Sequence, residues 1–274
     1  DNLINSPVCS RNFKDRKDVV YMGALYPQKN FYYLAKNWKK INKFIPKAKL
    51  HVIGSADTYG KNSKLGKYGL ADPEYEELFM NEINKDKTSA KNVIFHGNLK
   101  QSKYEFFSNC RVGIVNPLGN TETCCVSAVE MQAFGLPVCT GNYQALKTTV
   151  LNNRSGLLSN NQYQFRRNIF DVYTKEKLFS KLSSGAILNA KLNFSFSQII
   201  HRWYYLFYKI YSNQEIYISN QPSIISRKFS FIYFLRLLNK YLLKGLLRIR
   251  SGSIIVLSYY LKDLKIFLFK KFRK

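Results

Sequence analysis

The segment IVNPLGNTETCCVSAVEMQAFGLPV, residues 114–138, contains the end of one strand, a turn, a helix and the entry to a second strand. The apolar run at 111–117 predicts a short buried strand that ends at Asn116 and Pro117. Residues 123–134 have apolar side chains at helical spacing, and residues 136–140 predict the next strand. A strand, a helix and a strand in this order favour a right-handed β-α-β unit with parallel strands.

The same alternation extends towards both ends of the chain. Further strands are predicted at 19–23, 49–54 and 92–97, and helices at 31–44, 102–109 and 145–151. The sequence therefore predicts an α/β fold with a Rossmann-like, doubly wound parallel sheet. Ligands of such sheets bind at the carboxyl ends of the strands. Most of the predicted strands end at Gly or Pro, and glycine lets a ligand approach the backbone closely.

Other segments complete the predicted organisation of the chain. In the insertion between Ala56 and Lys91, Asp72 and Pro73 predict the N-cap and first residue of a helix that ends near Asn84. An aromatic-rich helix is predicted over 196–211. We divide the chain into a linker remnant at 1–17, a Rossmann-like domain at 18–211, a linker at 212–226 and a basic amphipathic helical tail at 227–274.

Two glutamates, Glu122 and Glu130, are the candidate chemical groups of the opening segment. On a helix that starts near 123, eight residues span roughly 12 Å and return to nearly the same face. Two carboxylates so placed can hold hydroxylated groups on either side of a pyrophosphate, which the free amides at the helix start would bind. The spacing alone is weak evidence, because Glu74 and Glu82 are also eight apart, in an acidic helix start where a solvated face is the simpler explanation.

The region around these glutamates resembles the Glu-x7-Glu segment of the family 4 glycosyltransferases, retaining enzymes with the two-domain GT-B fold. Residues 20–30, 93–97, 155–158 and 196–211 are similar to further segments of the same family. The resemblance covers residues 5–212 and implies the C-terminal, donor-binding half of a GT-B enzyme of the hexosyltransferase type. The N-terminal acceptor domain of such enzymes is missing from this sequence, so we expect the chain alone to be inactive in transfer.

The resemblance also implies roles for individual residues. Glu122 would bind the transferred sugar and Lys29 the departing diphosphate, and these two are the expected catalytic residues. Glu130 would bind the ribose, and the remaining donor contacts would come from Gly23, Thr123, Cys124, Cys125 and Val126. The implied donor is a UDP- or GDP-linked sugar, no cofactor is expected, and the acceptor is a glycan or a lipid-linked glycan. At Ala24 the chain departs from an arginine of the family, which removes a bidentate phosphate contact that lysine does not reproduce.

Metal and disulfide chemistry are not predicted. The chain has no Asp-x-Asp motif and no Cys-x-x-Cys pair, and its five cysteines include the adjacent Cys124 and Cys125. These features favour reduced thiols in a cytosolic protein and no metal site. The three histidines, His51, His96 and His201, are predicted to be structural, although His96 lies at the ligand edge of the predicted sheet.

The chain is strongly basic, with 43 Lys and Arg against 17 Asp and Glu and a net charge of +26. Such an excess implies an anionic partner: nucleic acid, phospholipid or a phosphorylated substrate. The tail at 227–274 has 13 basic residues and one acid, and its longest uncharged run, 251–261, is shorter than the roughly 20 residues of a membrane span. We expect amphipathic helices on an anionic membrane surface and a cytoplasmic protein peripheral to the inner face of the membrane. A nucleic-acid-binding tail, or one that packs on the absent domain, is the rival interpretation, and a basic nucleic-acid-binding α/β protein without catalytic activity is the alternative function.

Overall fold

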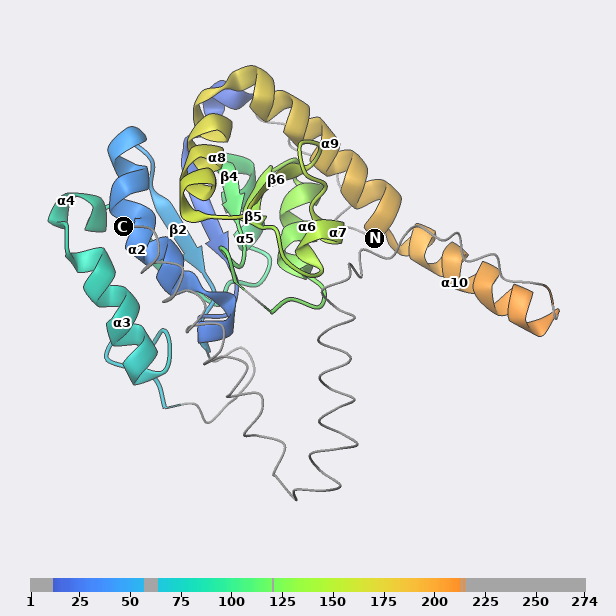
Figure 1. Cartoon of the computed structure of the whole chain (residues 1–274), viewed down its shortest axis with the longest axis horizontal. Helices are drawn as coiled ribbons and strands as arrows, with labels where there is room; N and C mark the ends of the chain where they lie inside the picture. Colours follow the sequence, from blue (N-terminus) through green and yellow to red (C-terminus); the bar gives the residue numbers. More distant parts are fainter. Residues whose placement is uncertain (1–11, 57–63, 120, 213, 215–274) are drawn as a thin grey trace, which may run out of the picture. The chain divides into compact units, whose positions relative to one another are not determined.

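The computed structural model describes residues 12–56, 64–119, 121–212 and 214 (Figure 1). Six parallel strands form one sheet in the order β3-β2-β1-β4-β5-β6. Their bounds are β1 (Asp18–Met22), β2 (Leu50–Ile53), β3 (Val93–Gly97), β4 (Cys110–Ile114), β5 (Val138–Gly141) and β6 (Gly156–Ser159). The predicted Rossmann-like, doubly wound sheet is confirmed. Strand order reverses between β1 and β4, which is where such sheets open a binding crevice at their carboxyl ends.

Helices cover both faces of the sheet (Figure 1). One face packs against α2 (Phe31–Phe44), α3 (Pro73–Asn84) and α8 (Gln162–Thr174), and the other against α5 (Lys103–Asn109), α6 (Val126–Ala133) and α7 (Leu146–Thr149). Strand β1 shows why, since Val19 and Tyr21 enter the first core and Val20 enters the second. A strand buried on both faces has a continuous run of apolar residues, and this run is why β1 could be predicted from the sequence.

Several element boundaries agree with the sequence prediction. Helices α2 and α10 (Phe196–Tyr211) have the predicted ends, and α3 starts at Pro73 with the Asp72 carboxylate accepting a hydrogen bond from the Glu74 amide. No helix was predicted at α4 (Lys87–Ala90), α8, α9 (Glu176–Phe194) or the short 3-10 helices η1 (Phe13–Asp15) and η2 (Pro27–Lys29).

The predicted start of the helix after β4 is wrong. Helix α6 begins at Val126 rather than at 123, so Glu122 lies in the preceding loop and does not share a helix face with Glu130. The loop leaves β4 through two residues with left-handed backbone, Asn116 and Leu118, at φ values of 38° and 51°. Contacts of Glu122 with other elements then keep residues 121–125 out of the helix, and these contacts are not visible in the local sequence.

The described part of residues 1–17 packs against the domain. The side chain of Arg16 is buried and donates hydrogen bonds to the carbonyl oxygens of Phe107, Cys110 and Phe134 at 2.9, 3.1 and 3.2 Å. At the other end, contacts divide the chain into two units after Tyr208, within α10. The predicted linker at 212–226, apart from residues 212 and 214, and the predicted membrane-binding tail at 227–274 lie outside the described residues.

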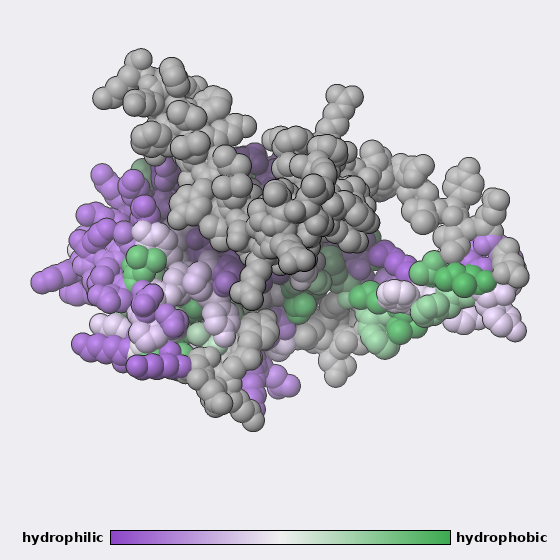
Figure 2. All heavy atoms as spheres, turned by 60° about the horizontal axis from the view of Figure 1, so that its bottom comes forward, coloured by the Kyte–Doolittle hydropathy of each residue, from purple (hydrophilic) through white to green (hydrophobic). Residues whose placement is uncertain are grey.

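Helix α10 is strongly amphipathic, and its apolar side chains form a hydrophobic band on the molecular surface (Figure 2). None of its side chains is buried in the described structure. Among the described residues, no helix combines the length and the apolar character needed to cross a membrane.

Candidate functional site

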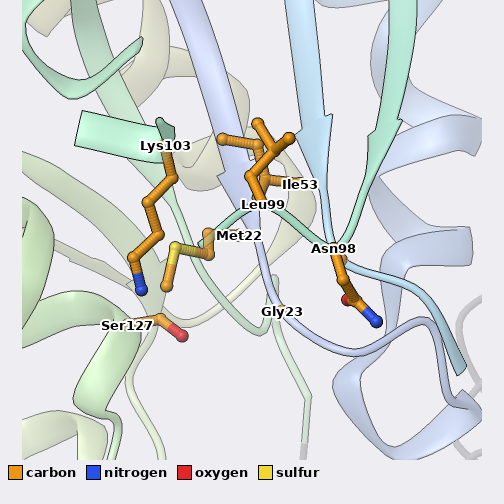
Figure 3. Close-up of a pocket in the computed structure, with 8 residues that line it drawn as sticks. Met22, Gly23, Ile53, Asn98, Leu99, Lys103 and Ser127 are labelled. Carbon is orange, nitrogen blue, oxygen red and sulfur yellow. The ribbon is translucent and has the colours of Figure 1, made fainter. Parts of the chain in front are cut away.

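The carboxyl edge of the sheet holds a cavity of about 420 Å³ at the point where the strand order reverses (Figure 3). Its walls come from the ends of β1 and β2, the segment after β3 and the first turns of α5 and α6. They include Met22, Gly23, Gly54, Asn98, Lys103 and Ser127. The cavity therefore occupies the position at which doubly wound sheets bind their ligands.

Bare backbone forms the part of this cavity between β1 and β2. The Gly23 amide donates a hydrogen bond to the Ile53 carbonyl oxygen at 3.1 Å. Gly54 has a φ of +126°, and a Cβ at this position would overlap the carbonyl oxygen of Gly23. The chain thus requires glycine at 54, and the two glycine turns leave a surface that a ligand can approach closely.

Glu122 is a buried carboxylate held by side chains from three segments. One of its oxygens, Oε2, lies 2.8 Å from Nζ of Lys29 and accepts a hydrogen bond from the Asn116 side-chain amide at 3.3 Å. Its backbone amide donates to Oε1 of Gln144 at 3.0 Å. The Glu122 side chain is 5% exposed and that of Lys29 is 29% exposed. The structure therefore brings together the two residues predicted to be catalytic, although 93 positions separate them in the sequence.

The loop between Glu122 and α6 supplies backbone donors. Within the described residues, the amides of Thr123, Cys124 and Cys125 have no hydrogen-bond partner, whereas the Val126 amide donates to the Cys124 carbonyl oxygen at 3.2 Å. The amides of Thr123, Cys124 and Cys125 are thus free to bind an anion, and they lie at the amino end of α6. Burial, with a smaller contribution from Glu122, raises the pKa of the Cys125 thiol to about 12, so Cys125 stays protonated and is no nucleophile.

Glu130, one turn after Ser127 on α6, is paired with a lysine that the sequence analysis did not single out. Nζ of Lys103 lies 2.8 Å from one carboxylate oxygen of Glu130 and 3.0 Å from the other. The two side chains are 16% and 17% exposed. Lys103 is one of 43 basic residues, and only the packing of α5 against the sheet reveals its place in the cavity. Each predicted acid therefore has its own lysine partner.

The predicted structural role of two histidines fits their contacts. Nδ1 of His51 lies 2.9 Å from Nε2 of His96, and Nε2 of His51 lies 3.2 Å from a carboxylate oxygen of Asp18. Both rings also pack against Phe106, with ring centroids 4.9 and 4.5 Å away. The two histidines therefore connect β1, β2 and β3 with α5.

The second glutamate pair with the same spacing lies on α3. Glu74 is exposed, as expected for a solvated helix face. The Glu82 side chain is only 15% exposed, and it pairs with Lys85 at 2.7 Å and accepts a hydrogen bond from the Tyr32 hydroxyl at 3.5 Å. Over the described ranges, no group of three or more His, Cys, Asp or Glu side chains is arranged to bind a metal ion.

Comparison with known proteins places this site in a family. The family model for glycosyl transferases group 1 matches residues 8–187, which is more than half of the chain. A search of curated proteins found no match.

Solved structures share the fold at low sequence identity. HepE of Anabaena in complex with UDP-glucose has a TM-score of 0.58 and 14% identity over 72% of this chain and 50% of its own. Sucrose-phosphate synthase of Thermosynechococcus elongatus has a TM-score of 0.57 and 18% identity over 75% and 52%. For a point mutant of TarM from S. aureus, in complex with fondaparinux, α-GlcNAc-glycerol and UDP, the values are 0.55 and 16% over 70% and 36%.

The chain spans between about a third and a half of the length of these three structures. Their fold matches the sheet described above, and the family model covers both glutamates, both lysines and the glycine turns of the site. The chain belongs to the glycosyl transferases group 1 family.

Proposed function

We propose that this chain is the donor-binding half of a retaining glycosyltransferase, which transfers a sugar from a UDP- or GDP-linked donor to a glycan or lipid-linked acceptor. In this proposal Glu122 binds the sugar and Glu130 binds the ribose hydroxyls. Lys29 and the free amides of residues 123–125 bind the diphosphate between them. Retention of the anomeric configuration is what the resemblance to family 4 implies.

One observation carries the proposal: two acid–lysine pairs flank the free amides before α6 at the carboxyl edge of the sheet. Glu122 and Lys29 lie on the loop side, and Glu130 and Lys103 lie on the cavity side. Carboxylates accept hydrogen bonds from sugar hydroxyls, whereas ammonium groups and backbone amides donate to phosphate oxygens. The arrangement thus offers acceptors and donors in the order that the sugar, diphosphate and ribose of a nucleotide-sugar need.

The comparisons support a nucleotide-sugar as the ligand class. HepE has been solved with UDP-glucose, and a pneumococcal O-GlcNAc transferase, GtfA, with UDP and GlcNAc; GtfA has a TM-score of 0.54 and 15% identity over 72% of this chain. These ligands belong to those proteins. For this chain they favour UDP as the first nucleotide to test, with GDP beside it.

The alternative is a basic nucleic-acid-binding protein, which the net charge of +26 favours. Calorimetric titration with UDP and GDP, and filter binding to duplex DNA over a range of salt concentrations, separate the two functions. We expect saturable binding of a nucleoside diphosphate. Salt-sensitive DNA binding without nucleotide heat would support the alternative instead.

Binding is the appropriate readout for this chain, since the proposed acceptor site lies between two domains of a GT-B enzyme. We expect the 274-residue chain to bind the donor nucleotide without transferring sugar. Contact of residues 227–274 with an anionic membrane surface, and with it a place at the inner face of the membrane, stays a prediction.

A further inference from the structure

The cavity wall carries a cation whose hydrogen bonds are incomplete. An ammonium group has three N–H donors, and the contacts of Lys103 Nζ with the two oxygens of Glu130 use at most two of them. In the described part of the chain the third has no hydrogen-bond acceptor, and Lys103 lines the cavity beside Ser127 (Figure 3). The cavity thus presents one available charged donor.

The position of Lys103 is costly unless an anion offsets it. Lys103 is the first residue of α5, where the partial positive charge of the helix disfavours a cation. The side chain is 16% exposed, so water screens the charge only in part. Glu130 is one such anion, and the Tyr104 ring lies 5.3 Å from Nζ. A second anion within the cavity would accept a hydrogen bond from the remaining N–H group of Lys103.

The same pair removes an electrostatic conflict in the proposed function. A carboxylate that binds ribose hydroxyls stands close to the phosphate attached to that ribose, and two negative charges in a partly buried site repel each other. An ammonium group between them attracts both. Lys29 pairs with Glu122 on the sugar side and Lys103 pairs with Glu130 on the ribose side, so Lys103 is the ammonium group that lies nearest to this conflict.

We propose that Lys103 is a binding residue that bridges Glu130 and the phosphate nearest the ribose of a bound nucleotide. The inference rests on the proposed function, because it requires the ribose to bind at Glu130. Lys103 then gives the site its preference for a nucleotide over the corresponding nucleoside.

The test compares uridine, UMP and UDP as ligands of the full chain by ligand-observed NMR titration, which measures weak binding. Lys103→Gln is expected to weaken UMP and UDP binding by about tenfold to a hundredfold, the usual effect of losing a charge-assisted hydrogen bond, and uridine binding by much less. Lys103→Arg is expected to keep the preference for UMP over uridine. Lys100→Gln is the matched control, since Lys100 is an exposed lysine of the same segment outside the cavity wall.

The outcomes separate this inference from the proposed function. Equal weakening of all three ligands by Lys103→Gln would overturn the bridge, since Lys103 would then only orient Glu130. Wild-type affinity for UMP and UDP in Lys103→Gln would overturn it as well. If the wild-type chain binds none of these ligands or their guanosine counterparts, the proposed function fails and the bridge fails with it. Thermal unfolding of each variant checks the fold, and Lys103→Arg tests the preference should Lys103→Gln not fold.

Discussion

Removing Lys29 tests whether the ion pair with Glu122 organises the loop before α6. In Lys29→Met the Glu122 carboxylate keeps its place, 5% exposed, with the Asn116 amide at 3.3 Å as its remaining side-chain donor in the described structure. A buried charge without its counter-ion is unfavourable because the protein interior solvates it poorly. The variant is therefore expected to lose stability although it gains an apolar side chain.

The structure sets the size of this loss. Breaking a fully buried ion pair by removing one partner costs about 3–5 kcal/mol, whereas exposed pairs contribute about 0–1 kcal/mol. The Lys29 side chain is 29% exposed and the Glu122 side chain is 5% exposed, so we expect the energy of this ion pair to lie between these limits. We expect the free energy of unfolding to fall by about 1–3 kcal/mol and the melting temperature by roughly 3–9 °C.

Urea unfolding followed by circular dichroism measures the loss, and Trp38, buried against α4, provides a fluorescence probe. Lys47→Met is the control, because Lys47 is an exposed lysine just before β2, at the amino edge of the sheet, whereas the Glu122 loop follows β4 at the carboxyl edge. Adding Glu122→Gln to Lys29→Met is expected to restore at least half of the lost stability, since a neutral amide needs no counter-ion. The reasoning is refuted if Lys29→Met resembles the control, or if the second substitution restores nothing.

Two further predictions concern stability. Gly54→Ala is expected to destabilise the fold by about 1–3 kcal/mol or more, because its φ of +126° and the Gly23 carbonyl oxygen leave no room for a Cβ. Gly69→Ala is the control and should cost about 1 kcal/mol, since Gly69 has a φ of +69° but a Cβ there meets no other atom. Equal losses of unfolding free energy for the two variants in urea would contradict this account. Burial, and secondarily the charge of His51, hold the pKa of His96 below its usual 6.5. The unfolded chain therefore takes up this proton at higher pH than the folded chain, so the stabilisation is complete above about pH 6.5 and is lost as the pH falls through the folded pKa. Between pH 7.5 and 5.5 the free energy of unfolding should fall less in His96→Gln than in the wild type, and identical slopes would show that His96 has no such role.

The sheet could be predicted because its strands are buried on both faces. Each short apolar run that ends in Gly or Pro corresponds to a strand, and Asp72 and Pro73 predict the start of the helix at 73–84. Such signals are local, because they depend on a few adjacent residues.

The details of the site depend on contacts between distant segments, and the sequence predicted one of these details wrongly and another not at all. A helix from 123 was expected because residues 123–134 have helical spacing, yet Lys29, Asn116 and Gln144 hold Glu122 in a loop conformation. The pairing of Lys103 with Glu130 likewise follows from how α5 and α6 pack on one face of the sheet. Neither contact has a local signature. The two glutamates were singled out by their eight-residue spacing together with their sequence context, and the geometric reason given for the spacing was wrong.

The central claim is that Glu130 binds the ribose of a nucleotide at the carboxyl edge of the sheet. Calorimetric titration of UDP into the wild type, Glu130→Gln and the charge-matched control Glu77→Gln, on the exposed face of α3, tests it most directly. We predict saturable binding to the wild type and to Glu77→Gln, and at least about tenfold weaker binding to a folded Glu130→Gln. Equal affinity of all three proteins for UDP would contradict the claim.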